Sequence, residues 1–367
     1  MEATGTEPSR AWAEVDLAAL RRNAAAIAAR AGAPLLPMVK ADGYGLGALP
    51  VARALDSLQP WGFGVATLDE AVALRRGGIT RPVLLFTPLL AAQAGACRAV
   101  EVRPCIGDVN ALAAWLALGP APFHLEIDSG MRRSGVPFND REILARLRSM
   151  LASAEGWEGA FTHFHSSDVD IESARVQWRR FQEALGALGR RPRWVHAASS
   201  AGALADPELG GDFARPGIYL YGGQAGNHRP EPVVRFRARV VSVRRVVPGE
   251  TVSYHATWTA TRPATIATIA AGYADGLHRS LSNRGQIELG GAAYPIAGRV
   301  TMDMTMVDVG DAPVRPGDVA TIFGGVVSLD QQAEAAGTIS YELLTAIGPR
   351  VERIYTGGQA DRRTGGQ

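Results

Sequence analysis

Residues 35–47 read LLPMVKADGYGLG, an apolar run that ends at Lys40 and continues into a glycine-rich turn. Seven more short apolar runs follow along the chain, separated by alanine-rich helical stretches, and this alternation is typical of parallel βα units. The eight predicted strands are residues 35–39, 61–65, 83–86, 102–106, 123–127, 159–164, 194–196 and 212–215. Eight such units predict a (β/α)8 barrel of the TIM type, an α/β fold that spans residues 11–230.

The pattern changes on either side of these strands. Ahead of the first strand, Asp16 is a predicted N-cap, and apolar residues recur at helical spacing from Leu17 to Ala28. Beyond residue 230, β-branched residues alternate and glycine turns separate the runs 233–247, 265–270, 286–289 and 319–323. The sequence therefore predicts a second, mainly β domain over residues 231–356. A polar tail, residues 357–367, is expected to be frayed.

The composition excludes several classes of function. With 47% hydrophobic residues and a net charge of +2, the 367-residue chain can bury one large core or two unequal ones. Its basic residues are scattered, so neither a nucleic acid nor a membrane is a predicted partner, and we expect a cytoplasmic enzyme. Cys97 and Cys105 fit neither a disulfide framework nor metal-ligand spacing. Both are predicted to be buried thiols.

The polar residues that follow the predicted strands form the candidate site, because active sites of such barrels lie at the C-terminal ends of the strands. These residues are Lys40, Tyr44, Glu126, Asp128, Arg133, His163, His165, Ser199, Ser200, Arg215 and Gly217. A lysine that is partly desolvated at a strand end has a lowered pKa and can act as a nucleophile or base. The alternative is a lysine whose amine simply reaches solvent.

Anion donors are also predicted in this barrel mouth. A phosphate site commonly follows the seventh and eighth strands, where the chain offers Ser200 and the backbone N–H groups of Gly217 and Ile218. A reactive lysine facing such donors suggests pyridoxal 5'-phosphate, although aldolase-type barrels combine the same two features. His163 and His165 could bind a metal, but the sequence offers no clear set of further ligands. No metal is therefore predicted.

Seven motifs occur in a fixed order along nearly the whole chain: PMVKADGYGLG, HLEIDSGMRRSGV, FTHF, ARPGIYLYG, VSYHAT, AGYADG and GRVTMDMTMVDV. In this combination they resemble the alanine racemase family. The resemblance implies a homodimer in which the barrel of one chain binds pyridoxal 5'-phosphate and the β domain of the other chain covers it. It also implies the interconversion of L-alanine and D-alanine, which supplies D-alanine for peptidoglycan, while a catabolic role is equally compatible.

The same resemblance assigns roles to individual residues. Lys40 would hold the cofactor covalently and act on D-alanine, and Tyr254 of the partner chain, a packing residue by its pattern alone, would act on L-alanine from the opposite face. Arg215 matches the arginine at the pyridine nitrogen, and it is too weak an acid to give that nitrogen a proton. His163 matches the histidine that stacks on the ring and links Arg215 to Tyr254. The other matched positions are Tyr44, Ser200, Gly217 and Ile218 at the phosphate, Arg133 near the substrate carboxylate, and Met302, Asp303 and Tyr273 on the partner's side of the pocket.

Four positions depart from the family pattern. Glu126 stands where many members have a lysine that is carbamylated to a carboxylate, so we predict that Glu126 pairs with Arg133 and that activity does not depend on bicarbonate. Ser199 replaces an asparagine, and Thr301 replaces a cysteine. Pro349 occupies a position where some members have a tyrosine that contacts the phosphate.

Other functions remain open at this point. The nearest alternative is a racemase of broader specificity, for example for serine, because pocket volume is not visible in the sequence. A cofactor-binding or amino-acid-binding protein without turnover is another, and Tyr254 argues against it. A decarboxylase is disfavoured by Arg215, since such enzymes offer an acidic partner to the pyridine nitrogen. A metal-dependent barrel hydrolase is the remaining alternative.

Overall fold

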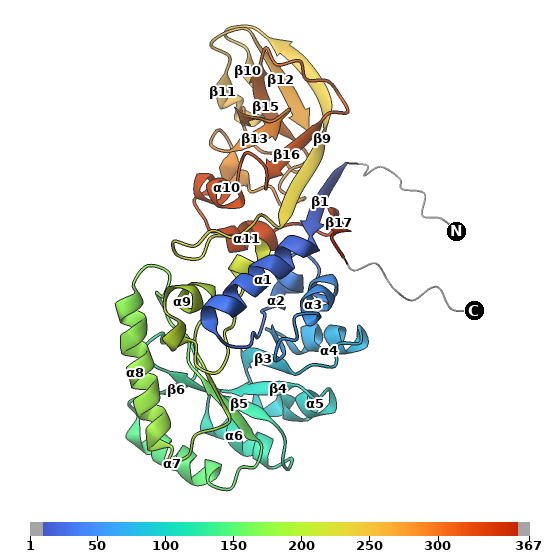
Figure 1. Ribbon diagram of the computed structural model, residues 1–367. Coiled ribbons are helices and arrows are strands. Elements are labelled where there is room, and N and C mark those ends of the chain that lie inside the picture. The colour runs from blue at the N-terminus through green and yellow to red at the C-terminus, as the bar shows by residue number, and fades with distance from the viewer. Residues whose placement is uncertain (1–9, 359–367) are drawn as a thin grey trace, which may run out of the picture.

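The computed structural model describes residues 10–358, in which a barrel and a strand-rich region lie end to end (Figure 1). Six parallel strands form the barrel sheet in chain order. They are β2 (Phe63–Val65), β3 (Val83–Pro88), β4 (Arg103–Ile106), β5 (Phe123–Asp128), β7 (Trp157–Phe161) and β8 (Trp194–His196), and β6 (Val136–Pro137) pairs with β5. The predicted barrel class is confirmed.

The predicted first and eighth strands, 35–39 and 212–215, differ from the prediction in detail. They form isolated bridges, Leu35 with Ala214 and Met38 with Gly64, and not regular strands. Three backbone hydrogen bonds close the ring here: Leu36 N–H donates to Ala214 O at 2.7 Å, Met38 N–H to Pro216 O at 2.9 Å, and Ala214 N–H to Pro34 O at 3.1 Å. Prolines lie within or beside both segments, and since proline has no N–H to donate, a continuous ladder cannot form.

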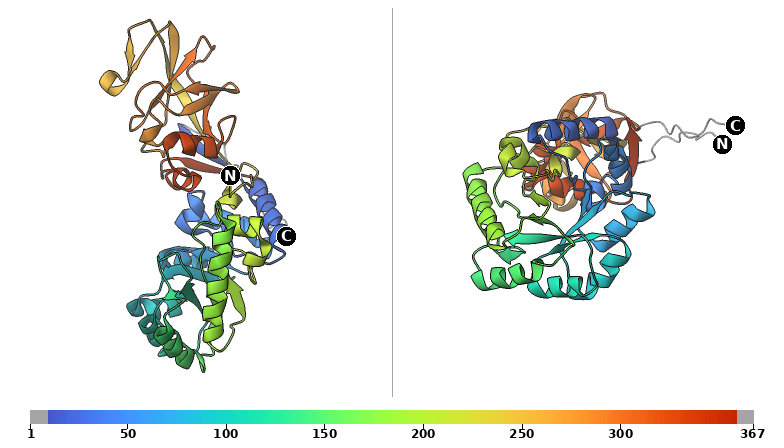
Figure 2. Two further views of the ribbon diagram at one scale, coloured as in Figure 1. Left: turned by 90° about the vertical axis from the view of Figure 1, so that its left-hand side faces the viewer. Right: turned by 60° about the horizontal axis from the view of Figure 1, so that its bottom comes forward.

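Helices surround the barrel strands (Figure 2). They are α1 (Leu17–Ala31), α3 (Ala48–Asp56), α4 (Leu68–Arg76), α5 (Ala94–Ala99), α6 (Val109–Leu116), α7 (Arg141–Leu151), α8 (Ile171–Ala187) and α9 (Ser200–Ala205). The start of α1 is as predicted: the Asp16 side chain accepts hydrogen bonds from the N–H groups of Ala18 and Ala19, which lack partners inside the helix. Cys97 and Cys105 are buried free thiols, which confirms that prediction.

The strand-rich region is organised around one long strand, β9 (Val234–Val246). Its other strands are β10 (Thr251–Val252), β11 (Trp258–Thr259), β12 (Ala264–Ile269), β13 (Gln286–Leu289), β14 (Ala292–Pro295), β15 (Thr305–Gly310), β16 (Val319–Phe323) and β17 (Glu352–Thr356). Two short helices, α10 (Leu329–Ala336) and α11 (Ser340–Thr345), lie on the side that faces the barrel (Figure 1). The four runs predicted here correspond to β9, β12, β13 and β16.

The sequence did not predict the strand β1 (Ala11–Asp16), which lies inside the predicted barrel segment 11–230. It pairs in parallel with β17 and antiparallel with β9, so it belongs to the sheet of the strand-rich region. A single cluster of buried apolar side chains extends from the barrel into this sheet. Of the predicted tail, Gly357 O accepts a hydrogen bond from Arg21, while residues 359–367 lie outside the described residues. Residues 10–358 contain no helix that is both long and apolar enough to cross a membrane.

Candidate active site

A left-handed turn follows Lys40. Residues 41–44 all have positive φ, between 51° and 62°, within the segment labelled α2 (Lys40–Tyr44). For residues other than glycine this conformation costs roughly 1–2 kcal/mol each, so the surroundings must hold it. Glu70 accepts from the first N–H of the turn at 2.6 Å, and Asp42 accepts from the N–H of Ala48 at 2.8 Å. The turn thereby directs both Lys40 and Tyr44 into one cavity.

This cavity lies at the C-terminal ends of the barrel strands and is lined by Met38, Lys40, Tyr44, Phe86, Glu126, Arg133, Phe161, His163, Ser199, Ser200, Arg215, Gly217, Ile218 and Tyr341. Every barrel residue that the sequence singled out as a cofactor or substrate ligand is present. Tyr341, on α11, was missed. The family pattern directed attention to Pro349 instead, and no local pattern in residues 340–345 indicates that this helix reaches the cavity.

Lys40 is the only lysine among the 367 residues. Burial lowers the pKa of its amine, and the positive charge of Arg133 lowers it further. A larger fraction of the amine is therefore neutral near pH 7 than for an exposed lysine. This is the property that a nucleophilic or basic lysine needs.

Hydrogen-bond donors gather at one end of the cavity. The Tyr44 ring stacks on Tyr221 with centroids 4.5 Å apart, and a Cβ at Gly217 would lie only 2.2 Å from the Tyr44 hydroxyl. Gly217 N–H donates to Ser200 Oγ at 2.9 Å, which leaves the hydroxyl hydrogen of Ser200 available. The N–H of Ile218 has no acceptor within residues 10–358. This end of the cavity is suited to a phosphate group.

Arg215 is buried beneath the cavity and held by four acceptors. Its NH1 donates to His196 Nδ1 at 2.8 Å, and its NH2 donates to Thr162 O, Ala197 O and His163 Nδ1 at 2.9, 2.6 and 3.0 Å. Burial lowers the pKa of the guanidinium to about 9, so it remains a cation at neutral pH. Its Nε–H has no acceptor among the residues that the structure describes, and Arg215 lines the cavity. A donor is therefore free for a ligand.

His163 is neutral. Burial lowers its pKa to about 3, with further contributions from the cations Arg215, Arg133 and Lys40. Because its Nδ1 accepts from Arg215, the single ring proton lies on Nε2. His163 can therefore donate a hydrogen bond into the cavity but carries no charge there.

Glu126 does not form the predicted ion pair with Arg133. Its Oε1 accepts from Ser134 Oγ at 2.8 Å, and its Oε2 accepts from the thiol of Cys105 at 3.3 Å. The loop after Arg133 lies close to Glu126, since a Cβ at Gly135 would be only 2.8 Å from Glu126 Cγ. This close approach brings the Ser134 hydroxyl within hydrogen-bond distance of the Glu126 carboxylate. Glu126 nevertheless supplies the one carboxylate of a cavity wall that also holds Lys40, Arg133 and Arg215.

The predicted residues of the strand-rich region do not line this cavity. Tyr254, Tyr273 and Met302 are exposed by 69%, 44% and 51%. Tyr254 lies between β10 and β11. These two strands are at the end of the molecule farthest from the barrel (Figure 1). Asp303 Oδ1 accepts from Arg350 NH2 at 2.9 Å. A single chain therefore does not bring Tyr254 to Lys40.

No group of three or more His, Cys, Asp or Glu side chains between residues 10 and 358 could hold a metal ion. Of the two predicted histidines, His163 bonds to Arg215, and His165 is exposed with its Nδ1 2.7 Å from Ser166 Oγ. The two rings therefore do not share a ligand site.

Comparison with known proteins identifies the family. Residues 15–225 match the alanine racemase N-terminal domain, and residues 233–355 match the alanine racemase C-terminal domain. The chain belongs to the alanine racemase family. Alanine racemase from Salinispora tropica is 40% identical over 372 residues, which cover 95% of this chain and 99% of that protein. This chain is accordingly an isomerase of the alanine racemase type.

Solved alanine racemases share the fold over almost the whole chain. The enzyme from Streptomyces coelicolor A3(2) superposes with a TM-score of 0.89 at 33% identity, covering 95% of this chain and 98% of that one. Alanine racemase from Bartonella henselae, solved with covalently bound pyridoxal phosphate, has a TM-score of 0.89 at 28% identity, with 95% of this chain and 100% of that one covered.

Proposed function

We propose that this racemase holds pyridoxal 5'-phosphate in the barrel cavity through Lys40, and that Tyr254 of the partner chain completes each active site of a homodimer. The observation that carries the proposal is the cavity itself. Its only lysine has a lowered pKa and shares the cavity with a cluster of phosphate donors and a buried guanidinium. A related alanine racemase binds pyridoxal phosphate covalently.

The charges of the cavity support this cofactor. Three cations, Lys40, Arg133 and Arg215, face one carboxylate, so the cavity attracts anions such as a phosphate and a substrate carboxylate. Tyr44, Ser200 and the N–H of Ile218 would hold the phosphate, and the lack of a side chain at Gly217 leaves space for the Tyr44 hydroxyl beside it. When bound, pyridoxal phosphate acts as an electron sink that acidifies the α-carbon of the amino acid.

Two bases on opposite faces then perform the proton transfers. Lys40 removes the α-proton of D-alanine or returns it, and the partner's Tyr254 does the same for L-alanine. Arg215 donates a hydrogen bond to the ring nitrogen but keeps its proton, which favours return of the proton to the α-carbon. Arg133 orients the substrate carboxylate, while Met302, Asp303 and Tyr273 of the partner chain would close the pocket. His163 stacks beside the cofactor ring.

The remaining assignments rest on the family. We propose that the enzyme is cytoplasmic and supplies D-alanine for peptidoglycan. We retain residues 11–230 and 231–356 as the barrel and β domains, with β1 contributing to the sheet of the latter.

Covalent trapping tests the cofactor site. After incubation with pyridoxal phosphate and reduction with borohydride, peptide mapping should find the label on Lys40. The N-terminal amine is the only other primary amine of the polypeptide, and a Lys40→Ala variant reports any labelling there. Absence of label on Lys40 in the wild type would overturn the proposal.

Subunit complementation tests the dimer. Lys40→Ala and Tyr254→Phe variants are each expected to be inactive, but a heterodimer of the two contains one intact site. An equal mixture that exchanges subunits should therefore regain about a quarter of the wild-type activity. If both residues of a site came from one chain, mixing would restore nothing.

A further inference from the structure

A line of buried polar side chains runs through the barrel, away from the cavity. Arg215 NH1 donates to His196 Nδ1 at 2.8 Å, and His196 Nε2 lies 2.9 Å from His124 Nδ1. His124 Nε2 lies 3.4 Å from Glu158 Oε2, and Arg103 Nε donates to that same oxygen at 2.8 Å. His196 ends its strand, whereas His124, Glu158 and Arg103 lie at the starts of theirs. The line therefore extends from the C-terminal end of the barrel to its N-terminal end.

The two imidazole rings in the middle of this line are fixed by packing. His196 lies between two aromatic rings, with centroids 4.3 Å from Phe213 and 5.1 Å from Phe161. His124 is equally buried, and a Cβ at Gly159 would lie 2.4 Å from its Nδ1. Neither ring has space to turn over, so their nitrogens face fixed partners.

Elementary hydrogen-bond chemistry gives this line one direction. A guanidinium has only donors, so His196 Nδ1 must accept from Arg215. Burial lowers the pKa of His196 and of His124, and each neutral ring has a single N–H. The proton of His196 is therefore on Nε2 and points to His124 Nδ1. The proton of His124 is then also on Nε2, which forms no hydrogen bond of good geometry within residues 10–358 but lies 3.4 Å from the negatively charged Oε2 of Glu158.

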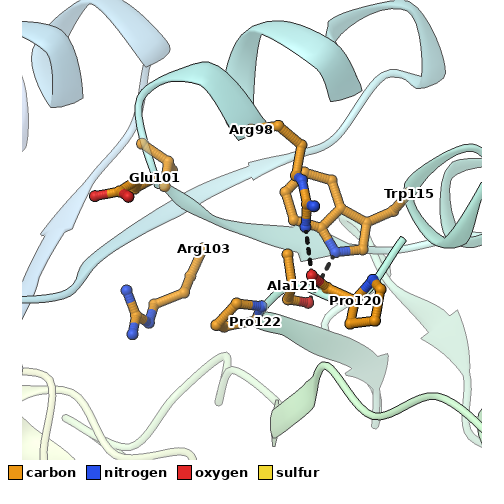
Figure 3. A pocket seen from close by; sticks show the side chains of 8 residues that line it. Arg98, Glu101, Arg103, Trp115, Pro120, Ala121 and Pro122 are labelled. Carbon is orange, nitrogen blue, oxygen red and sulfur yellow. Dashed lines mark hydrogen bonds between the residues drawn. The ribbon is translucent and has the colours of Figure 1, made fainter. Parts of the chain in front are cut away.

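The far end of the line reaches the protein surface. Arg103 and Glu101 line a pocket formed by residues that precede β4 and β5 (Figure 3). Burial of Glu158 would raise its pKa, but the hydrogen bond from Arg103 and the contact with His124 outweigh this and lower it, so Glu158 is ionised. The negative end of the line thus lies at the opposite end of the barrel from Lys40 and Arg215.

We infer that Glu158 is a positioning residue for Arg215: its negative charge, 3.4 Å from His124 Nε2, favours a proton on that nitrogen, and this fixes the tautomers of His124 and His196 and keeps an acceptor aimed at the guanidinium. Without the Glu158 carboxylate, the proton of His124 could move from Nε2 to Nδ1. His124 Nδ1–H would then face His196 Nε2–H, and two donors would oppose each other between the rings. The line would then lose its single direction, and Arg215 would lose its anchor at NH1. The effect on catalysis rests on the proposed function, whereas the tautomers do not.

Nuclear magnetic resonance of the cofactor-free protein, with histidine labelled by 15N, tests the tautomers directly. His124 and His196 should both be neutral with the proton on Nε2 at pH 7. Glu158→Leu should give His124 mixed tautomers, and Glu158→Gln should preserve them because its amide oxygen can accept. Glu101→Gln is the matched control, since it removes the same charge at an exposed position in the same pocket wall and should change nothing.

The loaded enzyme supplies a second measurement. Glu158→Leu should lower kcat roughly tenfold with KM for alanine little changed, while Glu158→Gln should recover most of the loss and Glu101→Gln should match the wild type. A wild-type ring with its proton on Nδ1, a protonated ring at pH 7, or tautomers that survive Glu158→Leu would overturn the inference. Mixed tautomers of His124 in Glu158→Gln would also overturn the inference. This variant supplies the test if Glu158→Leu does not fold. Correct tautomers in a protein that does not racemise alanine would instead count against the proposed function.

Discussion

The close approach of Gly217 to Tyr44 allows a quantitative test of the phosphate end of the cavity. A Cβ at residue 217 would lie 2.2 Å from the Tyr44 hydroxyl oxygen and 3.0 Å from Cζ, so in Gly217→Ala the ring must move by about 1 Å. Tyr44 is buried and stacked on Tyr221, which leaves it no space to move without disturbing its packing. We expect the variant to be destabilised by about 1–3 kcal/mol. Displacing the hydroxyl should also weaken retention of pyridoxal phosphate by roughly tenfold.

A double-mutant cycle separates the clash from other effects of the substitution. Tyr44→Phe removes the atom that Cβ would strike, so Gly217→Ala should cost clearly less stability in the Tyr44→Phe background than in the wild type. Gly186→Ala in α8 is the matched control, because a Cβ there meets nothing within 4 Å. Urea unfolding of the cofactor-free protein and absorbance titration with pyridoxal phosphate provide the two measurements. Equal costs in both backgrounds, or a Gly217→Ala variant as stable as Gly186→Ala, would refute the reasoning.

Three further predictions concern the charged and polar groups of the barrel. His163, His124 and His196 have lowered pKa values in the folded protein, so the unfolded chain binds more protons than the folded protein below pH about 6.5. The free energy of unfolding should therefore fall as the pH decreases, by up to about 1.4 kcal/mol per pH unit for each histidine. Urea unfolding between pH 7 and 5 measures this, and a free energy of unfolding that does not fall over this range would contradict it. Glu126 raises the pKa of Arg215, so Glu126→Gln should shift the alkaline limb of the kcat/KM profile to lower pH, and neither protein should respond to bicarbonate. An unmoved limb would exclude this coupling. Tyr341→Phe should weaken cofactor retention by roughly two- to tenfold, because one hydroxyl of the cavity wall is lost, whereas unchanged retention would show that this hydroxyl is not used.

The sequence predicts the barrel well because each βα unit is marked by local patterns. Prediction from the sequence fails where paired strands are distant in the chain. The strand β1 is only six residues long, and its partners β9 and β17 are more than 200 residues away in the sequence. The first and eighth barrel segments were predicted as regular strands, yet proline limits them to single bridges.

The candidate site shows the same division. Strand ends and motifs located the cavity residues of the barrel, because the fold brings all strand ends together. The partners of Glu126 were not predictable, since a carboxylate among cations and hydroxyls can choose several donors, and Ser134 is the one that the tight loop presents. Glu158 carried no signal at all, and His124 appeared only as the first residue of the motif HLEIDSGMRRSGV, with no role assigned to it. They lie near the starts of strands, at the end of the barrel where no active site is expected.

The placement of β1 bears on the order in which the protein can be completed. During synthesis residues 11–16 emerge long before residues 352–356, yet these two segments are hydrogen-bonded neighbours in one sheet. The barrel strands can pair while translation continues, because their contacts are mostly between successive units, but the pairing of β1 with β17 must wait for residues 352–356. The complete cavity must wait as well, because Tyr341 of α11 is part of its lining. In the proposed dimer, active sites arise only between finished chains.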